Sequence, residues 1–133
     1  MYLLDTNVCI HVLNERHEGL LKRFRETSPA EIALCSVVKA ELIYGARRSQ
    51  RVEENLQCLD RFFGPLPSLP FDDRCAQEYG RIRADLAEQG RPVGPNDLLI
   101  AAIACAHDAI LVTHNTDEFG RITGLRLQDW EAG

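Results

Sequence analysis

The sequence predicts an α/β fold of three layers, α/β/α, in which helices cover both faces of a mostly parallel central sheet. Short apolar segments alternate along the chain with longer segments of helical periodicity, as in sheets built from strand–helix units. The segments "IALCS" (32–36) and "ILVT" (110–113) are apolar at nearly every position, which is typical of strands buried on both faces. A chain of 133 residues can bury a real core, and we expect one domain over residues 1–133.

The first half of the chain is expected to contain two strands and three helices. The first strand runs directly into a carboxylate, Asp5, where a glycine or proline would be the usual turn residue. Ser36 follows the second strand and is the expected N-cap of the next helix. The expected elements are strands at 2–4 and 32–36 and helices at 8–25, 37–48 and 52–63.

The second half is expected to contain two helices and two strands. Three prolines in "GPLPSLPFD" exclude a helix there and leave a loop with at most a short edge strand. The segment "NDLLIAAIACAHDA" is apolar on nearly every side, which indicates a helix buried all round. The remaining elements are a helix at 72–88, a strand at 110–113 and a weaker strand within "LRLQDW".

Composition narrows the class of protein. The net charge of −5 argues against a protein that coats nucleic acid non-specifically, and the excess of arginine over lysine decides nothing by itself. The five cysteines are widely spaced and form no C-x-x-C pair, so we expect buried, reduced thiols. No segment has the pattern of a membrane span or a signal peptide, so a cytoplasmic protein without membrane contact is the expectation.

Carboxylates occur where strands are expected to end. Functional groups of open α/β sheets gather beyond the carboxyl ends of the strands, so four separate segments should meet at one edge. Glu41 joins them because Val37, Ala40, Glu41 and Tyr44 have helical spacing, which predicts that all four face inward. The side chains at this edge are Asp5, Glu41, Asp97 and, after the strand at 110–113, Asn115, Asp117 and Glu118.

Each of these acids also has a structural interpretation. Asp5 could cap the following helix, Asp97 could favour a helix dipole, and Glu41 could pair with an arginine. The acids after the last buried strand could belong to a solvated loop. These interpretations do not explain why all four segments map to the same edge. Converging carboxylates repel one another unless a cation lies between them, and an oxygen-rich site without thiolates suits Mg²⁺ or Mn²⁺.

Four segments together resemble the PIN-domain family, in particular the VapC toxins of bacterial toxin–antitoxin pairs. They are "LLDTNV", "SVVKAELIYGA", "VGPNDLLIAAIA" and "LVTHNTDEF", in this order and spacing, and the similarity covers nearly the whole chain. The resemblance implies a single PIN-like nuclease domain over residues 1–133. It also implies Mg²⁺- or Mn²⁺-dependent cleavage of RNA, with tRNA, and initiator tRNA in particular, as the indicated substrate.

The resemblance also implies roles for individual residues. Asp5, Glu41 and Asp97 match the family's metal-binding catalytic acids, and Asn115 stands where a fourth acid often follows the last strand. Because Asn115 is neutral, Asp117 is the alternative fourth acid. The implied partners are a VapB-type antitoxin, an RNA substrate, a second copy in a homodimer and, through the antitoxin, operator DNA. A PIN-like RNA- or protein-binding module without activity is the alternative function.

Three further features have two interpretations each. Arg47, Arg48 and Arg51 could contact RNA phosphates or simply form a solvated helix end. His114 is the one histidine that could act as a base, or it is a plain loop histidine. The helix at 52–63 carries four large apolar side chains that could form a contact surface or complete the core: Leu56, Leu59, Phe62 and Phe63. No late lysine suits a receiver domain, and no G-x-G-x-x-G follows the first strand, which argues against nicotinamide chemistry.

Overall fold

A computed structural model describes residues 1–132 of the chain. Its centre is a five-stranded sheet in which every pair of neighbouring strands is parallel, in the order β3-β2-β1-β4-β5. The strands are β1 (Tyr2–Leu4), β2 (Ile32–Cys35), β3 (Ser68–Leu69), β4 (Ile110–Val112) and β5 (Arg126–Gln128). The predicted parallel sheet is therefore confirmed, including the short edge strand among the prolines.

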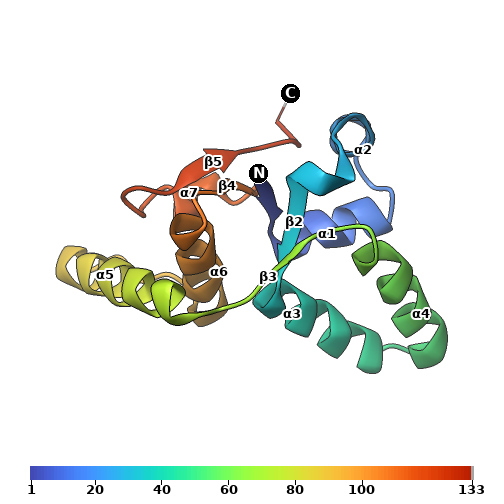
Figure 1. Cartoon of the computed structure of the whole chain (residues 1–133), viewed down its shortest axis with the longest axis horizontal. Helices are drawn as coiled ribbons and strands as arrows, with labels where there is room; N and C mark the ends of the chain where they lie inside the picture. The colour runs from blue at the N-terminus through green and yellow to red at the C-terminus, as the bar shows by residue number, and fades with distance from the viewer. Residues whose placement is uncertain (133) are drawn as a thin grey trace.

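Helices cover both faces of this sheet, which confirms the three-layer α/β/α architecture (Figure 1). On one side lie helices from the first half of the chain: α1 (Thr6–Leu13), α2 (Glu18–Glu26), α3 (Ser36–Arg47) and α4 (Val52–Phe63). On the other side α5 (Asp73–Gln89) and α6 (Pro95–Ala106) pack together. The remaining short elements are the 3₁₀ helix η1 (Pro29–Glu31) and the helix α7 (Thr116–Phe119).

Strand order reverses between β1 and β4, because the chain first builds outward from β1 to β3 and then returns to β4 on the other side. The register places Leu3 beside Ala33 of β2 and Leu111 of β4. Such a switch point leaves a crevice beyond the carboxyl ends of the two strands. The residues that follow β1 and β4 are thereby brought to one place.

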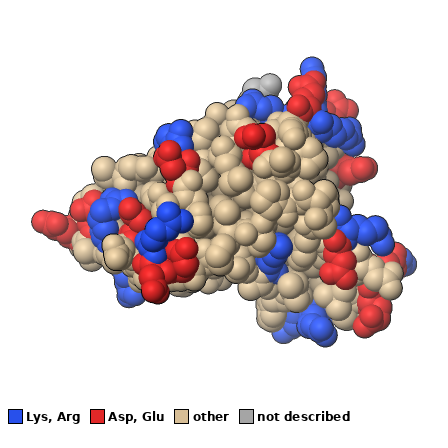
Figure 2. Space-filling view, in the orientation of Figure 1, with Lys and Arg blue, Asp and Glu red and all other residues tan. Residues whose placement is uncertain are grey.

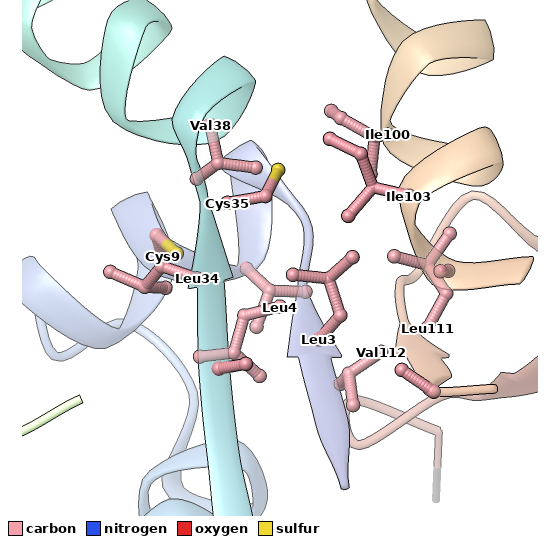
Figure 3. Close-up of a cluster of buried hydrophobic side chains, with 14 of the residues drawn as sticks. Leu3, Leu4, Cys9, Leu34, Cys35, Val38, Ile100, Ile103, Leu111 and Val112 are labelled. Atoms are coloured by element: carbon pink, nitrogen blue, oxygen red, sulfur yellow. The ribbon is translucent and has the colours of Figure 1, made fainter. Parts of the chain in front are cut away.

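The core lies where the strands meet helices of both layers (Figure 3). Leu3 and Leu111 are fully buried in the centre of the sheet, and Val38 of α3 and Ile103 of α6 are fully buried in the helical layers. Six of the twelve residues of α6 are buried, as expected of a helix apolar on every side. This packing fixes the backbone on which the polar edge of the sheet is built.

The helix predicted over residues 8–25 is wrong as a single element. The chain forms α1 and α2 with a break between them, in which Glu15 has a positive φ of 52° and Asn14 caps α1. His17 then starts α2, because its Nδ1 accepts a hydrogen bond from the Leu20 amide at 3.0 Å. Leu13 and Leu20 are seven residues apart, which imitates one continuous helical stripe across the break.

One further local prediction about a helix was wrong. Ser36 is not an N-cap: β2 ends at Cys35, which holds the cap position without a side-chain bond among the described residues, and Ser36 is already helical. The large apolar side chains of α4 favour the second of their two interpretations, since they help to complete the core. Leu59 is buried, and its neighbours in the helix are partly buried against the core: Leu56, Phe62 and Phe63.

Other sequence predictions concern cysteines and membrane spans. All five cysteines are free thiols, and three of them are buried. Among residues 1–132, no helix combines the length and apolarity that a membrane crossing requires.

Candidate active site

Asp5 follows the end of β1, and a backbone hydrogen bond together with burial fixes its side chain. Its Oδ1 accepts a hydrogen bond from the Val8 amide at 2.8 Å, so it is the N-cap of α1, as the structural interpretation proposed. The residue is only 6% exposed. Burial raises the pKa of the Asp5 carboxyl above its ordinary value, although bonds from Thr113 and Val8 oppose the shift. Capping therefore does not exclude a second role; it holds the carboxylate rigidly at the switch point.

Glu41 is held from two sides by neighbours of the other acids. The Thr6 hydroxyl donates to Oε1 at 2.6 Å, and Asn96 Nδ2 donates to Oε2 at 3.3 Å. Glu41 makes no ion pair with any cationic side chain among residues 1–132, so the predicted alternative of an arginine partner is wrong. A carboxylate tied to both α1 and α6 has a defined position between Asp5 and Asp97.

The stripe that contains Glu41 does not face the core as predicted. Tyr44 is 64% exposed and Ala40 is also exposed, whereas the buried face of α3 carries Val38, Leu42 and Ala46. The stripe instead lines a cleft of about 760 Å³ between α1, α3 and α6. The periodicity identified one face of the helix correctly, but that face borders a cleft.

Asp97 occupies the first turn of α6, directly after Gly94 and Pro95. Burial raises the pKa of its carboxyl to about 6, and the charges of Glu118, Asp5 and Glu41 raise it further in that direction. A dipole interaction at the helix start would lower this pKa, so it does not dominate here. The shift therefore reflects burial first and the nearness of three other carboxylates second.

Glu118 of α7 is the acid whose charge acts most on Asp97; the sequence predicted it at this edge, but the candidates for the fourth position were Asn115 and Asp117. Its Oε1 accepts from the Gly94 amide at 2.9 Å and its Oε2 from Asn115 Nδ2 at 2.6 Å. A side-chain hydrogen bond to Glu118 also contributes to the raised pKa of Asp97. The spacing of Asn115 and Glu118 across one helical turn was the available signal.

The two residues proposed for the fourth position have different surroundings. Asn115 holds Glu118 through its amide, and its own backbone amide donates to the Thr113 hydroxyl at 3.0 Å. Asp117 is exposed and is absent from the groups that raise the pKa of Asp97. The structure thus brings Asn115 to the site through Glu118 and leaves Asp117 facing solvent.

The three predicted acids do not form a tight cage: Glu41 lines the cleft, and Asp5 and Asp97 adjoin two other lining residues, Thr6 and Asn96. Within residues 1–132, two groups of three side chains place their metal-ligating atoms within 4.8 Å of one another, and neither contains Asp5, Glu41 or Asp97. Mg²⁺ is usually bound by one or two carboxylates and keeps several waters. An open arrangement of acids therefore fits a hydrated Mg²⁺ better than a closed structural site.

The remaining predicted residues lie outside this constellation. Arg47 is exposed, Arg48 contacts the Tyr44 hydroxyl at 3.5 Å and Arg51 pairs with Glu54 at 3.5 Å. Basic side chains gather near the end of α3 on the face in Figure 2, whose centre is largely free of charge. His114 Nδ1 lies 2.9 Å from Asp129 Oδ2, which raises the pKa of the imidazole.

Comparison with known proteins gives one consistent result. Residues 2–125 match the PIN domain. The tRNA(fMet)-specific endonuclease VapC of Shigella flexneri is 43% identical over 129 residues, 97% of this chain and 97% of that protein. The crystal structure of VapBC2 from Rickettsia felis bound to a DNA fragment from their promoter aligns with a TM-score of 0.91 at 38% identity, covering 97% of this chain and 98% of that one.

A second solved structure, DNA-bound VapBC from Salmonella typhimurium, aligns with a TM-score of 0.91 at 40% identity and covers 97% of both chains. The matches extend over the sheet, both helical layers and every segment that carries an acid of the site. The chain belongs to the PIN-domain family.

Proposed function

We propose that this chain is a divalent-metal-dependent endoribonuclease of the VapC type, the toxin of a toxin–antitoxin pair, and that it cleaves initiator tRNA. One observation carries the proposal. Asp5, Glu41, Asp97 and Glu118 converge from four segments on the switch point of the sheet, and none forms an ion pair among residues 1–132. The similarity to a tRNA(fMet)-specific endonuclease supports the substrate.

The residues fit Mg²⁺ or Mn²⁺. Their donor atoms are carboxylate oxygens, and burial together with the charges of neighbouring acids raises the pKa of Asp97 to about 6, which a nearby cation would oppose. Asp5 and Asp97 would hold the ion directly, with Glu41 and Glu118 beside it. A bound ion of this kind supplies water of lowered pKa and neutralises charge on the scissile phosphate.

The chain's own residues set the geometry of the reaction. Asp5 is held by its cap on α1, so its carboxylate has a fixed direction. Thr6 and Asn96 orient the Glu41 carboxylate, which would accept a proton from the attacking water. Asn115 and the Gly94 amide orient Glu118 against Asp97. Glu41 lines the cleft beside α3 together with Thr6 and Asn96, the neighbours of Asp5 and Asp97, so the phosphodiester backbone would approach the acids from this cleft.

Cleavage of purified initiator tRNA, mapped by sequencing of the product ends, tests the proposal. We expect a single dominant cut that requires Mg²⁺ or Mn²⁺, is abolished by EDTA and is absent from Asp97→Asn. Elongator tRNAs serve as the matched control substrates. If the wild-type chain binds RNA but cuts none of these tRNAs with either metal, the alternative of a PIN-like binding module without activity replaces the proposal.

The partners follow from the same relatives. Solved VapBC complexes contain a second protein and, in two cases, DNA. We propose that residues 1–133 form one nuclease domain and that the chain forms a homodimer. We also propose that it binds a VapB-type antitoxin that contacts operator DNA. Light scattering of the isolated chain at tens of micromolar tests the homodimer. A monomeric mass at this concentration would contradict it.

A further inference from the structure

A second group of side chains lies at the same edge of the sheet, beyond the end of β5, and the proposed reaction does not use it. His114 follows β4, and Asp129 and Glu131 follow β5. One ligating atom from each of these three residues lies within 4.8 Å of the other two. We infer that His114, Asp129 and Glu131 form a second cation site, one that takes a first-row transition-metal ion such as Zn²⁺.

Glu131 provides the observation that points to a ligand. Its side chain is only 8% exposed, and its Oε1 contacts His11 Nδ1 at 2.5 Å. Its Oε2 is buried and has no hydrogen-bond partner among residues 1–132. A buried carboxylate oxygen without a partner is costly, and an ion or an ordered water is the usual reason that one persists. A cation beside His114 and Asp129 would satisfy this oxygen.

The charges around the group are consistent with a cation. The ion pairs of Asp129 and Glu131 within residues 1–132 are with histidines, His114 and His11, and none is with lysine or arginine. The nearby Arg23 is engaged elsewhere, since it donates to Gln128 and lies 5.0 Å from the Trp130 ring centre. Within residues 1–132 the two carboxylates are therefore paired with imidazoles and with no permanently charged side chain.

The donor set selects the class of metal. Imidazole with two carboxylates suits Zn²⁺ and similar ions, whereas the all-oxygen acids of the active site suit Mg²⁺. Three protein ligands leave a position open for water, as in non-structural zinc sites. Zinc bonds of about 2.0–2.2 Å would require ligand atoms about 3.5 Å apart. The His114 side chain is 66% exposed, so few neighbours oppose the small movement of its ring that would close the remaining distance.

Zinc titration of the full chain, labelled with ¹⁵N in its histidine rings, tests this inference. We expect the ring nitrogens of His114 to move to a metal-bound shift and saturate at one equivalent. The shift should persist in Asp97→Asn, which alters only the active site. Asp129→Asn and Glu131→Gln should each weaken zinc binding by at least about tenfold. Asp108→Asn is the matched control, because Asp108 is an exposed acid paired with Arg126.

The same spectra give the contrary outcomes. An unchanged His114 ring at saturating Zn²⁺ would show that His114 and Asp129 form only an ion pair. A shift that survives both Asp129→Asn and Glu131→Gln would show a surface histidine binding zinc alone. If circular dichroism shows that one of these variants does not fold, His114→Asn decides by calorimetry, and an unchanged number of bound zinc ions overturns the inference. Binding is the readout throughout, so failure here leaves the proposed nuclease activity untouched.

Discussion

The Thr6 hydroxyl donates a hydrogen bond to Glu41 Oε1 at 2.6 Å, across 35 positions of sequence. Thr6 directly follows Asp5, and Asn96, the second donor to Glu41, directly precedes Asp97. Each of two proposed metal ligands thus has a neighbour that orients the same third carboxylate. The bond joins α1 to α3 at the mouth of the cleft, so the positions of the acids are mechanically coupled.

Replacing Thr6 with valine should test this coupling. Valine keeps the shape of threonine but removes the hydroxyl, so Glu41 loses its shortest bond and its fixed orientation. We expect tRNA cleavage to fall by about tenfold, the low end for a residue that supports a metal ligand. Thr27→Val is the control, because the Thr27 hydroxyl bonds only a backbone carbonyl of its own helix. Equal cleavage by Thr6→Val and wild type would show that Glu41 needs no support.

Asp97→Asn should abolish cleavage while preserving the fold. A direct metal ligand should matter more than residues that support ligands, so we expect a loss of at least about 100-fold. Without metal the variant should also melt at a higher temperature than the wild type near neutral pH, because one repelling carboxylate is gone. Single-turnover cleavage and thermal melting in EDTA measure both effects, and full activity in the variant would contradict the proposed site.

The pKa of Asp97 also predicts a pH dependence of stability in the absence of metal. Its folded pKa, about 6, lies above the ordinary value of 3.8, so the folded state binds the proton more tightly than the unfolded chain. The stabilisation from this proton is fully present below pH 3.8 and is lost as pH rises through about 6. The melting advantage of Asp97→Asn over wild type should therefore grow from pH 4 to pH 7 in EDTA. If the difference in melting temperature between Asp97→Asn and wild type stays constant from pH 4 to pH 7, the pKa of Asp97 is not raised.

Three substitutions distinguish the candidates for the fourth position. Glu118→Gln should reduce cleavage most and raise the Mg²⁺ concentration needed for half activity, because it removes charge beside Asp97. Asn115→Ala should cost about tenfold, since Asn115 orients Glu118. Asp117→Asn is the matched control in the same short helix and should behave like wild type. A larger loss in Asp117→Asn than in Glu118→Gln would reverse this assignment.

Arg47 is exposed at the end of α3 and should contribute to RNA binding through phosphate contact. We expect Arg47→Ala to weaken tRNA binding several-fold, to reduce the slope of log Kd against log salt by about one, and to leave single-turnover cleavage at saturation unchanged. Arg25→Ala is the control, because Arg25 is also an exposed arginine but lies on a different helix, α2, where it pairs with Glu15. If Arg47→Ala and Arg25→Ala bind equally well, the basic cluster is only a solvated helix end.

Much of the fold was readable from local patterns. Asp5 could be placed because a three-residue apolar strand ends there, and Asp97 because an all-apolar helix starts with an acid. Parallel order then predicts a common edge for the residues that follow β1 and β4. These inferences need only the alternation of strands and helices, which short-range periodicity carries.

Tertiary structure decided which acid lies beside Asp97 and which faces are covered. Glu118 reaches Asp97 because the backbone amide of Gly94 and the amide of Asn115 hold it, and no periodicity encodes a contact across 24 positions. Likewise, Leu59 is buried and Tyr44 exposed because of how α3 and α4 pack, although both belong to apolar helical stripes. Sequence determines which side chains share a face of an element, because that depends on helix and strand geometry alone. Whether the face meets core, cleft or solvent depends on the neighbours that the whole fold brings to it.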